Sequence, residues 1–99
     1  MAAREVEFHE EAAAEFKEAF LWYHEHDATV AADFADELIH SVRTIAEAPQ
    51  RWPLHVAGTR KLLLHRFPFV IVYRDYEAVI QILAVAHAKR RPGYWLNRL

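Results

Sequence analysis

The sequence predicts one α+β domain over residues 1–99: an N-terminal strand, an antiparallel two-helix hairpin and a three-stranded antiparallel meander that packs on the helices. Three observations predict this class. Apolar residues recur at three- and four-residue spacing between residues 10 and 47, as on amphipathic helices. Three runs rich in Val, Ile, Leu and aromatic residues follow between residues 60 and 87. The joins between these runs are short, so neighbouring strands must be antiparallel.

The composition fits a single folded domain of a reducing compartment. The chain has 99 residues, of which 54% are hydrophobic and 13% aromatic, which suits a folded globule better than a disordered chain. It contains no cysteine, so it has no disulfide, zinc-thiolate site or thiol nucleophile. The N-terminus lacks the pattern of a signal peptide, and no apolar run is long enough to span a membrane. We therefore expect a cytoplasmic protein without membrane contact.

The first half of the chain predicts a strand and two helices. Val6 and Phe8 alternate with charged residues, as in a short strand. From Glu10 to about residue 25 the apolar period becomes helical. Asp27 is a plausible N-cap of a second helix, which Pro49 ends. The short connection between the two amphipathic helices predicts that they form an antiparallel hairpin.

The second half predicts a loop and a sheet. Residues 49–58 contain two prolines and a glycine and indicate a loop, from which we expect Trp52 and Leu54 to pack back on the core. Strands are expected at about 60–67, 69–75 and 78–87. Both alternating faces of these strands are largely apolar, so one face should cover the helices while the other forms a shallow groove.

The charge of the chain is divided between its halves. Residues 1–48 hold three basic and twelve acidic residues, a net charge of −9, and residues 49–99 hold nine basic and two acidic residues, a net charge of +7. This division indicates a basic surface for a polyanion or an acidic protein segment, or two halves that neutralise one another. The basic residues expected around the groove are Arg60, Arg66, Arg74, Lys89, Arg90 and Arg91. An apolar groove with a basic rim is suited to an acidic, amphipathic peptide.

Two stretches carry a family resemblance, FPFVIVYR at residues 67–74 and VAHAKRRPGYW at residues 85–95. With the predicted order of elements, they make nearly the whole chain similar to the RelE/ParE superfamily of bacterial toxins. The resemblance implies a type II toxin–antitoxin system, with growth arrest or plasmid stabilization as its outcome. It also implies a hetero-oligomer in which the acidic, amphipathic C-terminal segment of a cognate antitoxin wraps around the toxin. Lys61 and Trp95 join the six basic residues as expected contacts of the antitoxin or the target.

The superfamily divides on mechanism. RelE-like members are ribosome-dependent ribonucleases that cut messenger RNA, whereas ParE-like members inhibit DNA gyrase. RelE-like nucleases resemble one another in two lysines on the second strand, an arginine on the third, and an arginine and a tyrosine near the C-terminus. Here Lys61 is accompanied by Leu63, and Val70 stands where the arginine would be. Because cations stabilise the phosphoryl transition state, these departures favour a ParE-like toxin that binds its target and is not an enzyme.

Two alternatives stay open. Some ribonuclease relatives use histidine, so a messenger RNA endoribonuclease would rely on His65, His87, Arg90 and Tyr94. His87 is then a base, or else a structural hydrogen-bonding residue, and the Tyr94 and Trp95 rings stack on bases or pack against the sheet. The second alternative is a degenerate toxin that only binds its antitoxin. No cofactor or metal is expected, since His24 and His26 point apart on a helix.

Overall fold

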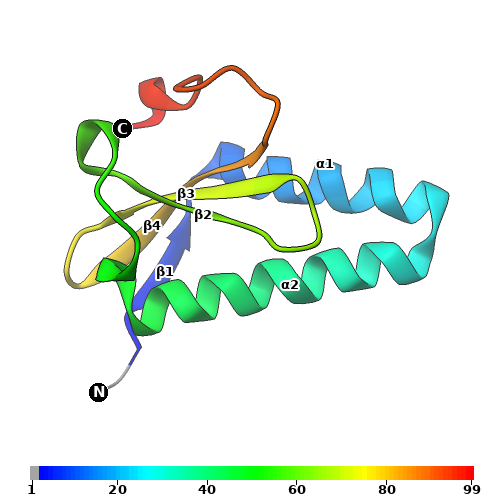
Figure 1. Cartoon of the computed structure of the whole chain (residues 1–99), viewed down its shortest axis with the longest axis horizontal. Coiled ribbons are helices and arrows are strands. Elements are labelled where there is room, and N and C mark those ends of the chain that lie inside the picture. Colours follow the sequence, from blue (N-terminus) through cyan, green and yellow to red (C-terminus); the bar gives the residue numbers. More distant parts are fainter. Residues whose placement is uncertain (1–2) are drawn as a thin grey trace.

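The computed structural model describes residues 3–99 as a four-stranded sheet with two helices on one face (Figure 1). The elements are β1 (Glu5–Phe8), α1 (Glu10–His26), α2 (Ala28–Glu47), β2 (Arg60–Leu63), β3 (Phe69–Asp75) and β4 (Val79–His87). Short 3-10 turns occupy Pro49–Arg51, Val56–Gly58 and Leu96–Arg98. The predicted fold class is confirmed: an N-terminal strand and a helical hairpin precede the three strands of the meander.

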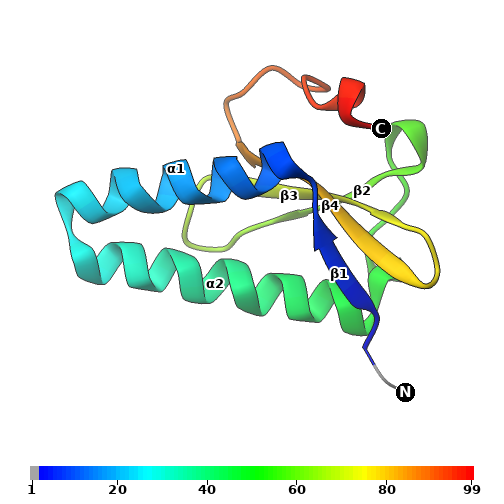
Figure 2. The same cartoon turned by 180° about the vertical axis from the view of Figure 1, so that it is seen from behind.

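The strand order in the sheet is β1-β4-β3-β2. β2 pairs with β3 and β3 with β4, both antiparallel, as the meander prediction requires. β1 pairs with β4 in parallel, with Glu5 opposite Val79 and Phe8 opposite Ile82, so the complete sheet is mixed. Figure 2 shows β1 lying along β4 at the edge of the sheet.

The helical hairpin forms where its cap and periodicity predict. The Asp27 carboxylate accepts hydrogen bonds from the backbone N–H groups of Thr29 at 2.8 Å and Val30 at 3.4 Å, which satisfies two free donors of the first turn of α2. α2 ends at Glu47, and Pro49 begins the following 3-10 turn. α1 and α2 lie side by side and antiparallel in both views (Figures 1 and 2).

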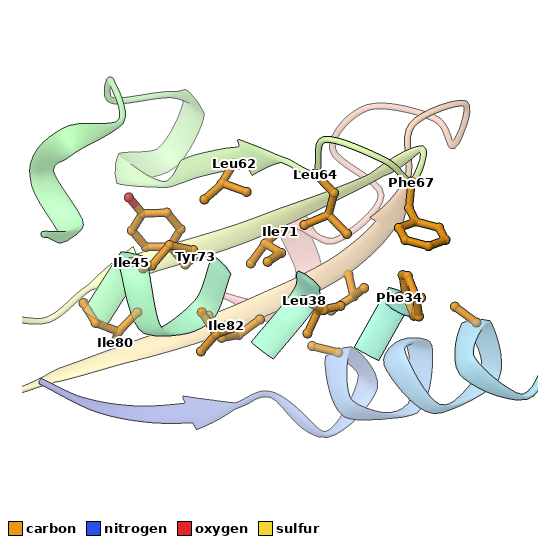
Figure 3. Packing of buried hydrophobic residues seen from close by; sticks show 14 residues of the cluster. Phe34, Leu38, Ile45, Leu62, Leu64, Phe67, Ile71, Tyr73, Ile80 and Ile82 are labelled. Atoms are coloured by element: carbon orange, nitrogen blue, oxygen red, sulfur yellow. The ribbon is translucent and has the colours of Figure 1, made fainter. Parts of the chain in front are cut away.

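The main core lies between the helices and the sheet (Figure 3). Phe34 of α2 is fully buried, and its ring centroid lies 5.3 Å from that of Phe67 and 5.2 Å from that of Phe69. The other fully buried side chains of this cluster are Leu38, Ile45, Ile71, Tyr73, Ile80, Ile82 and Ala12. Trp52 packs against the cluster as predicted. The prediction for Leu54 is wrong, because its side chain is exposed between two 3-10 turns.

β2 is shorter than predicted: it ends at Leu63 and not at residue 67. The Glu37 carboxylate of α2 accepts hydrogen bonds from the backbone N–H groups of His65 and Arg66. These donors therefore serve a contact with the helix and not a strand ladder. Leu64 and Phe67 are buried in the core from this bend, which explains why the apolar pattern continues past the strand.

β4 contains a bulge that shapes the face opposite the helices. Val72 pairs with Ala84 and Tyr73 with Ile82, so Leu83 is an extra residue in β4. Leu83 and Ala84 both belong to a second buried cluster, with Val72 and Trp95. The pairing of β1 with β4 ends at Ile82, immediately before this bulge.

Candidate functional site

The face of the sheet away from the helices is covered by the tail segment, residues 88–99. Trp95 is buried and packs in the cluster of Val72, Leu83 and Ala84, with Tyr94 beside it. The packing of the tail on the sheet, which the sequence offered as one interpretation of Tyr94 and Trp95, is thus what the structure shows. The tail fills much of the space in which the sequence predicted a groove.

What remains is a basic depression of about 110 Å³ between the tail and the sheet. Its apolar lining comes from Val70, Val72, Ala86 and Trp95, and its basic lining from Lys61, Arg90 and Arg91, with His55 beside them. Lys89 is exposed next to Arg90. An apolar floor with several cations at its rim is suited to an acidic group attached to an apolar segment.

The tail is fastened to α1 by a buried carboxylate. Glu15 has a side chain only 12% exposed. It accepts hydrogen bonds from the Tyr94 hydroxyl at 2.6 Å and from both terminal nitrogens of Arg98 at 2.9 Å. The backbone N–H of Val85 donates to the same carboxylate at 3.0 Å. Glu15 therefore joins α1, β4 and the tail through charge-assisted hydrogen bonds.

Arg98 completes this cluster. Its side chain is 7% exposed, and its Nη1 also donates to the Leu83 carbonyl at 2.9 Å. Its Nε lies 3.0 Å from a carboxylate oxygen of Glu11, which is more exposed. A guanidinium at this depth is stable only when it is paired, and the geometry supplies two carboxylates and a carbonyl.

The cluster shifts the acidity of its members in the directions that pairing predicts. Burial raises the pKa of Glu15, but hydrogen bonds from Arg98, Tyr94 and Val85 outweigh it, and the pKa lies below its usual value. Burial and then the hydrogen bond to Glu15 raise the pKa of the Tyr94 hydroxyl strongly. The hydrogen bond to Glu15 raises the pKa of Arg98. The Tyr94 hydroxyl is therefore a firmly protonated donor.

Arg90 lies between this cluster and solvent. Its guanidinium carbon is 3.9 Å from the centroid of the Tyr94 ring, in cation–π contact, and its Nη1 is 3.7 Å from a Glu15 oxygen. The side chain is nevertheless 54% exposed. Arg90 is thus held in place on one side and accessible on the other.

The structure brings two of the four catalytic candidates together. Arg90 and Tyr94 are in contact. His87 reaches the margin of the depression, but its ring packs edge-on against Phe69 at 5.2 Å, and its Nδ1 accepts the Lys89 N–H at 3.1 Å. His65 follows the end of β2, where Glu37 binds its backbone, so it does not share a strand face with Leu63.

The other predicted rim residues lie elsewhere. Arg60 donates a hydrogen bond to the Trp52 carbonyl and secures the loop. Arg66 forms an ion pair of 3.3 Å with Asp33 of α2. The guanidinium of Arg74 stacks over the Tyr76 ring at 5.1 Å.

The two apolar residues that depart from the RelE-like pattern are neighbours in the sheet. Leu63 of β2 pairs with Val70 of β3. Leu63 is 63% exposed, and Val70 lies in the floor of the basic depression.

Glu15 and Arg98 are the residues that sequence reasoning missed. For Glu15 a signal exists: it follows Ala12 by three positions and precedes Ala19 by four, on the apolar stripe of α1. A carboxylate on such a stripe predicts a buried partner. The partner itself is 83 residues away, which no local pattern reveals.

Two negative findings apply to residues 3–99. No helix in this part of the chain is long and apolar enough to cross a membrane. Among the same residues, no group of three or more His, Cys, Asp or Glu side chains is arranged to hold a metal ion. His24 and His26 instead stack with Phe20 and Trp22, respectively.

Comparison with known proteins shows first which fold the chain shares and then which family it belongs to. A solved structure described as the chromosomal ParDE TA system from P. aeruginosa superposes with a TM-score of 0.76 at 22% identity, covering 88% of this chain and 98% of that chain. This likeness shows that the two share a fold. A search of curated proteins finds no significant match. The family described as "ParE toxin of type II toxin-antitoxin system, parDE" matches residues 6–92. The chain belongs to this ParE toxin family.

Proposed function

We propose that this ParE-family toxin acts by binding and inhibiting DNA gyrase, without substrate chemistry of its own, and that a cognate antitoxin neutralises it. The observation that carries the proposal, beside the family match, is the apolar pair Leu63 and Val70, of which Val70 lines the basic depression. A nuclease of the RelE type would need cations there to stabilise the charge of the phosphoryl transition state.

The environment of the catalytic candidates also favours binding over catalysis. A leaving-group acid must give up its proton near neutral pH. The Tyr94 hydroxyl is unsuited to that role, because it donates to Glu15 and its pKa is raised. His87, the best candidate base, has its ring against Phe69 and its Nδ1 engaged by Lys89.

The proposed antitoxin contact uses two surfaces. Lys61, Arg90 and Arg91 would bind the carboxylates of an acidic segment, and the exposed Leu63 side chain would bind its apolar residues. A larger apolar groove of about 480 Å³ lies between β1 and the two helices. It is lined by Val6, Phe8, Ala13, Phe16, Leu38, Ile39, Val42 and Arg43. A segment that wraps around the toxin would fill this groove with apolar side chains.

The proposal is tested by assaying the purified protein against both targets. We expect it to block DNA supercoiling by gyrase and to leave messenger RNA on ribosomes uncut in a primer-extension assay. Codon-positioned cuts with normal supercoiling would replace the proposal by the ribonuclease alternative. Binding to the antitoxin without either activity would identify a degenerate toxin.

A further inference from the structure

We infer that Glu15 is a positioning residue for the partner-binding surface: through Tyr94 it sets the place from which the Arg90 guanidinium meets an acidic group of the partner. The inference rests on the proposed function, and it adds that the basic surface with Arg90, which the antitoxin would cover, is also the surface that meets gyrase. The geometric part of the inference is independent of which target is bound.

Glu15 is itself held in place by the unpaired end of β4. β1 stops pairing at Ile82, so beyond the bulge no strand among residues 3–99 lies beside this edge of β4. There Glu15 accepts the Val85 N–H at 3.0 Å and Arg98 donates to the Leu83 carbonyl at 2.9 Å. The two side chains thus supply the acceptor and the donor that a further strand would have supplied. The position of the carboxylate is therefore set by the sheet.

Glu15 in turn holds the tail at two residues, Tyr94 and Arg98. Its Oε2 receives the Tyr94 hydroxyl at 2.6 Å and the Arg98 Nη2 at 2.9 Å, which are four residues apart in the tail. Two attachment points prevent the tail from rotating about either one. Below them, Trp95 is buried on the sheet. Glu15 thus fixes the hydroxyl end of the Tyr94 ring, which also packs against the cluster that contains Trp95.

The Tyr94 ring holds the guanidinium of Arg90. Its guanidinium lies 3.9 Å from the centre of the Tyr94 ring and 3.7 Å from Glu15, while 54% of the side chain is exposed. A guanidinium that is already ordered loses less side-chain entropy when it binds a carboxylate. Without the Glu15 carboxylate the ring is released, and Arg90 returns to the mobility of an ordinary surface arginine.

The geometric part is tested in the full chain by NMR of the Arg90 side chain. The Nε–H signal of Arg90 carries a ring-current shift from Tyr94 because the two groups are stacked. We expect the shift to collapse in Glu15→Gln and in Tyr94→Phe, which keeps the ring but loses the hydroxyl. Glu18→Gln, an exposed glutamate of the same helix, should leave it unchanged. An unaltered Arg90 signal in folded Glu15→Gln and Tyr94→Phe proteins would overturn the inference.

The functional part is tested by the concentration that half-inhibits gyrase supercoiling. We expect it to rise about tenfold or more in Glu15→Gln and Tyr94→Phe, at a temperature at which circular dichroism shows both variants folded, and to stay the same in Glu18→Gln. Tyr94→Phe keeps the Glu15–Arg98 pair, so a purely structural role of Glu15 would leave that variant at full potency and refute the functional claim. Absence of inhibition by the wild-type protein would reject the proposed function, and the Arg90 signal would still decide the positioning.

Discussion

At the scale of single residues, the sequence predicts that Glu15 is buried and needs a partner, but it does not predict which residue the partner is. Its spacing from Ala12 and Ala19 places a carboxylate on the buried stripe of α1, and such a group must find a partner. That the partner is Arg98 follows only from the tail crossing the sheet. The apolar character of Leu63 and Val70, by contrast, is read directly from the sequence, and the structure places Val70 in the floor of the depression.

The first residue-scale prediction concerns pH. Because the pKa of Glu15 is lower in the folded protein than its ordinary value of 4.5, the carboxylate stabilises the fold fully above about pH 4.5. This contribution is lost as the pH falls through the lower native pKa, where the folded-state carboxylate also binds a proton. We therefore expect the difference in unfolding free energy between wild type and Glu15→Gln to be constant near neutral pH and to shrink below about pH 4.5. Urea denaturation at a series of pH values measures it; a difference that persists undiminished into strong acid contradicts it.

A second residue-scale prediction concerns the buried Tyr73. Its hydroxyl donates to the Pro49 carbonyl at 2.6 Å, and burial is the main cause that raises its pKa to about 12, so it remains a donor at neutral pH. We expect Tyr73→Phe to lower the unfolding free energy by about 1 kcal/mol, because a buried carbonyl loses its partner. Urea denaturation is the measurement. Tyr76→Phe, at an exposed tyrosine on the loop that follows β3, serves as the control and should change little.

At the scale of elements, local signals predicted the helices well and the sheet less well. Asp27, the apolar period and Pro49 are all local, and both helices begin and end near the expected residues. β2 was predicted too long because Leu64 and Phe67 are apolar for a different reason: they pack into the core from a bend that Glu37 holds. The parallel pairing of β1 with β4 joins the two ends of the fold, and no short-range pattern specifies it.

The element-scale prediction concerns the start of α2. Asp27→Ala removes the acceptor for the N–H groups of Thr29 and Val30, so we expect a loss of about 1 kcal/mol in unfolding free energy. Asp36→Ala, an exposed position within the same helix, is the matched comparison. Thermal or urea denaturation measures the unfolding free energy of both variants. Equal stability of the two would show that the cap contributes nothing measurable.

At the scale of the whole molecule, part of the charge of the two halves is neutralised by ion pairs within the fold. Arg98 pairs with Glu15, Arg66 with Asp33 and Arg4 with Asp75, so several cations neutralise acids of the same chain. The interpretation that the charges neutralise one another therefore accounts for part of the pattern. The basic residues around the depression (Lys61, Arg90 and Arg91) and the neighbouring Lys89 are exposed, and we propose that they bind a partner.

The whole-molecule prediction concerns these exposed basic residues. We expect Arg91→Glu to weaken binding of the proposed cognate antitoxin about tenfold or more, and added salt to weaken binding by the wild-type protein. Arg51→Glu reverses another exposed charge, in the loop after α2, and should leave affinity unchanged. Titration calorimetry at two salt concentrations measures both effects. Similar losses in the two variants would indicate a general charge effect and not a local contact.

The pairing of β1 with β4 has a consequence for how the protein is made. β1 emerges early during translation, but the strand beside it, with Val79 opposite Glu5, emerges late. The N–H group that Glu15 accepts belongs to Val85, 70 residues further along. A nascent chain can form the helical hairpin from local contacts, yet it must leave β1 unpaired until most of the chain has been synthesised. Interrupted synthesis would therefore yield fragments that lack the basic surface, so the toxin acquires this surface only in the last stage of its production.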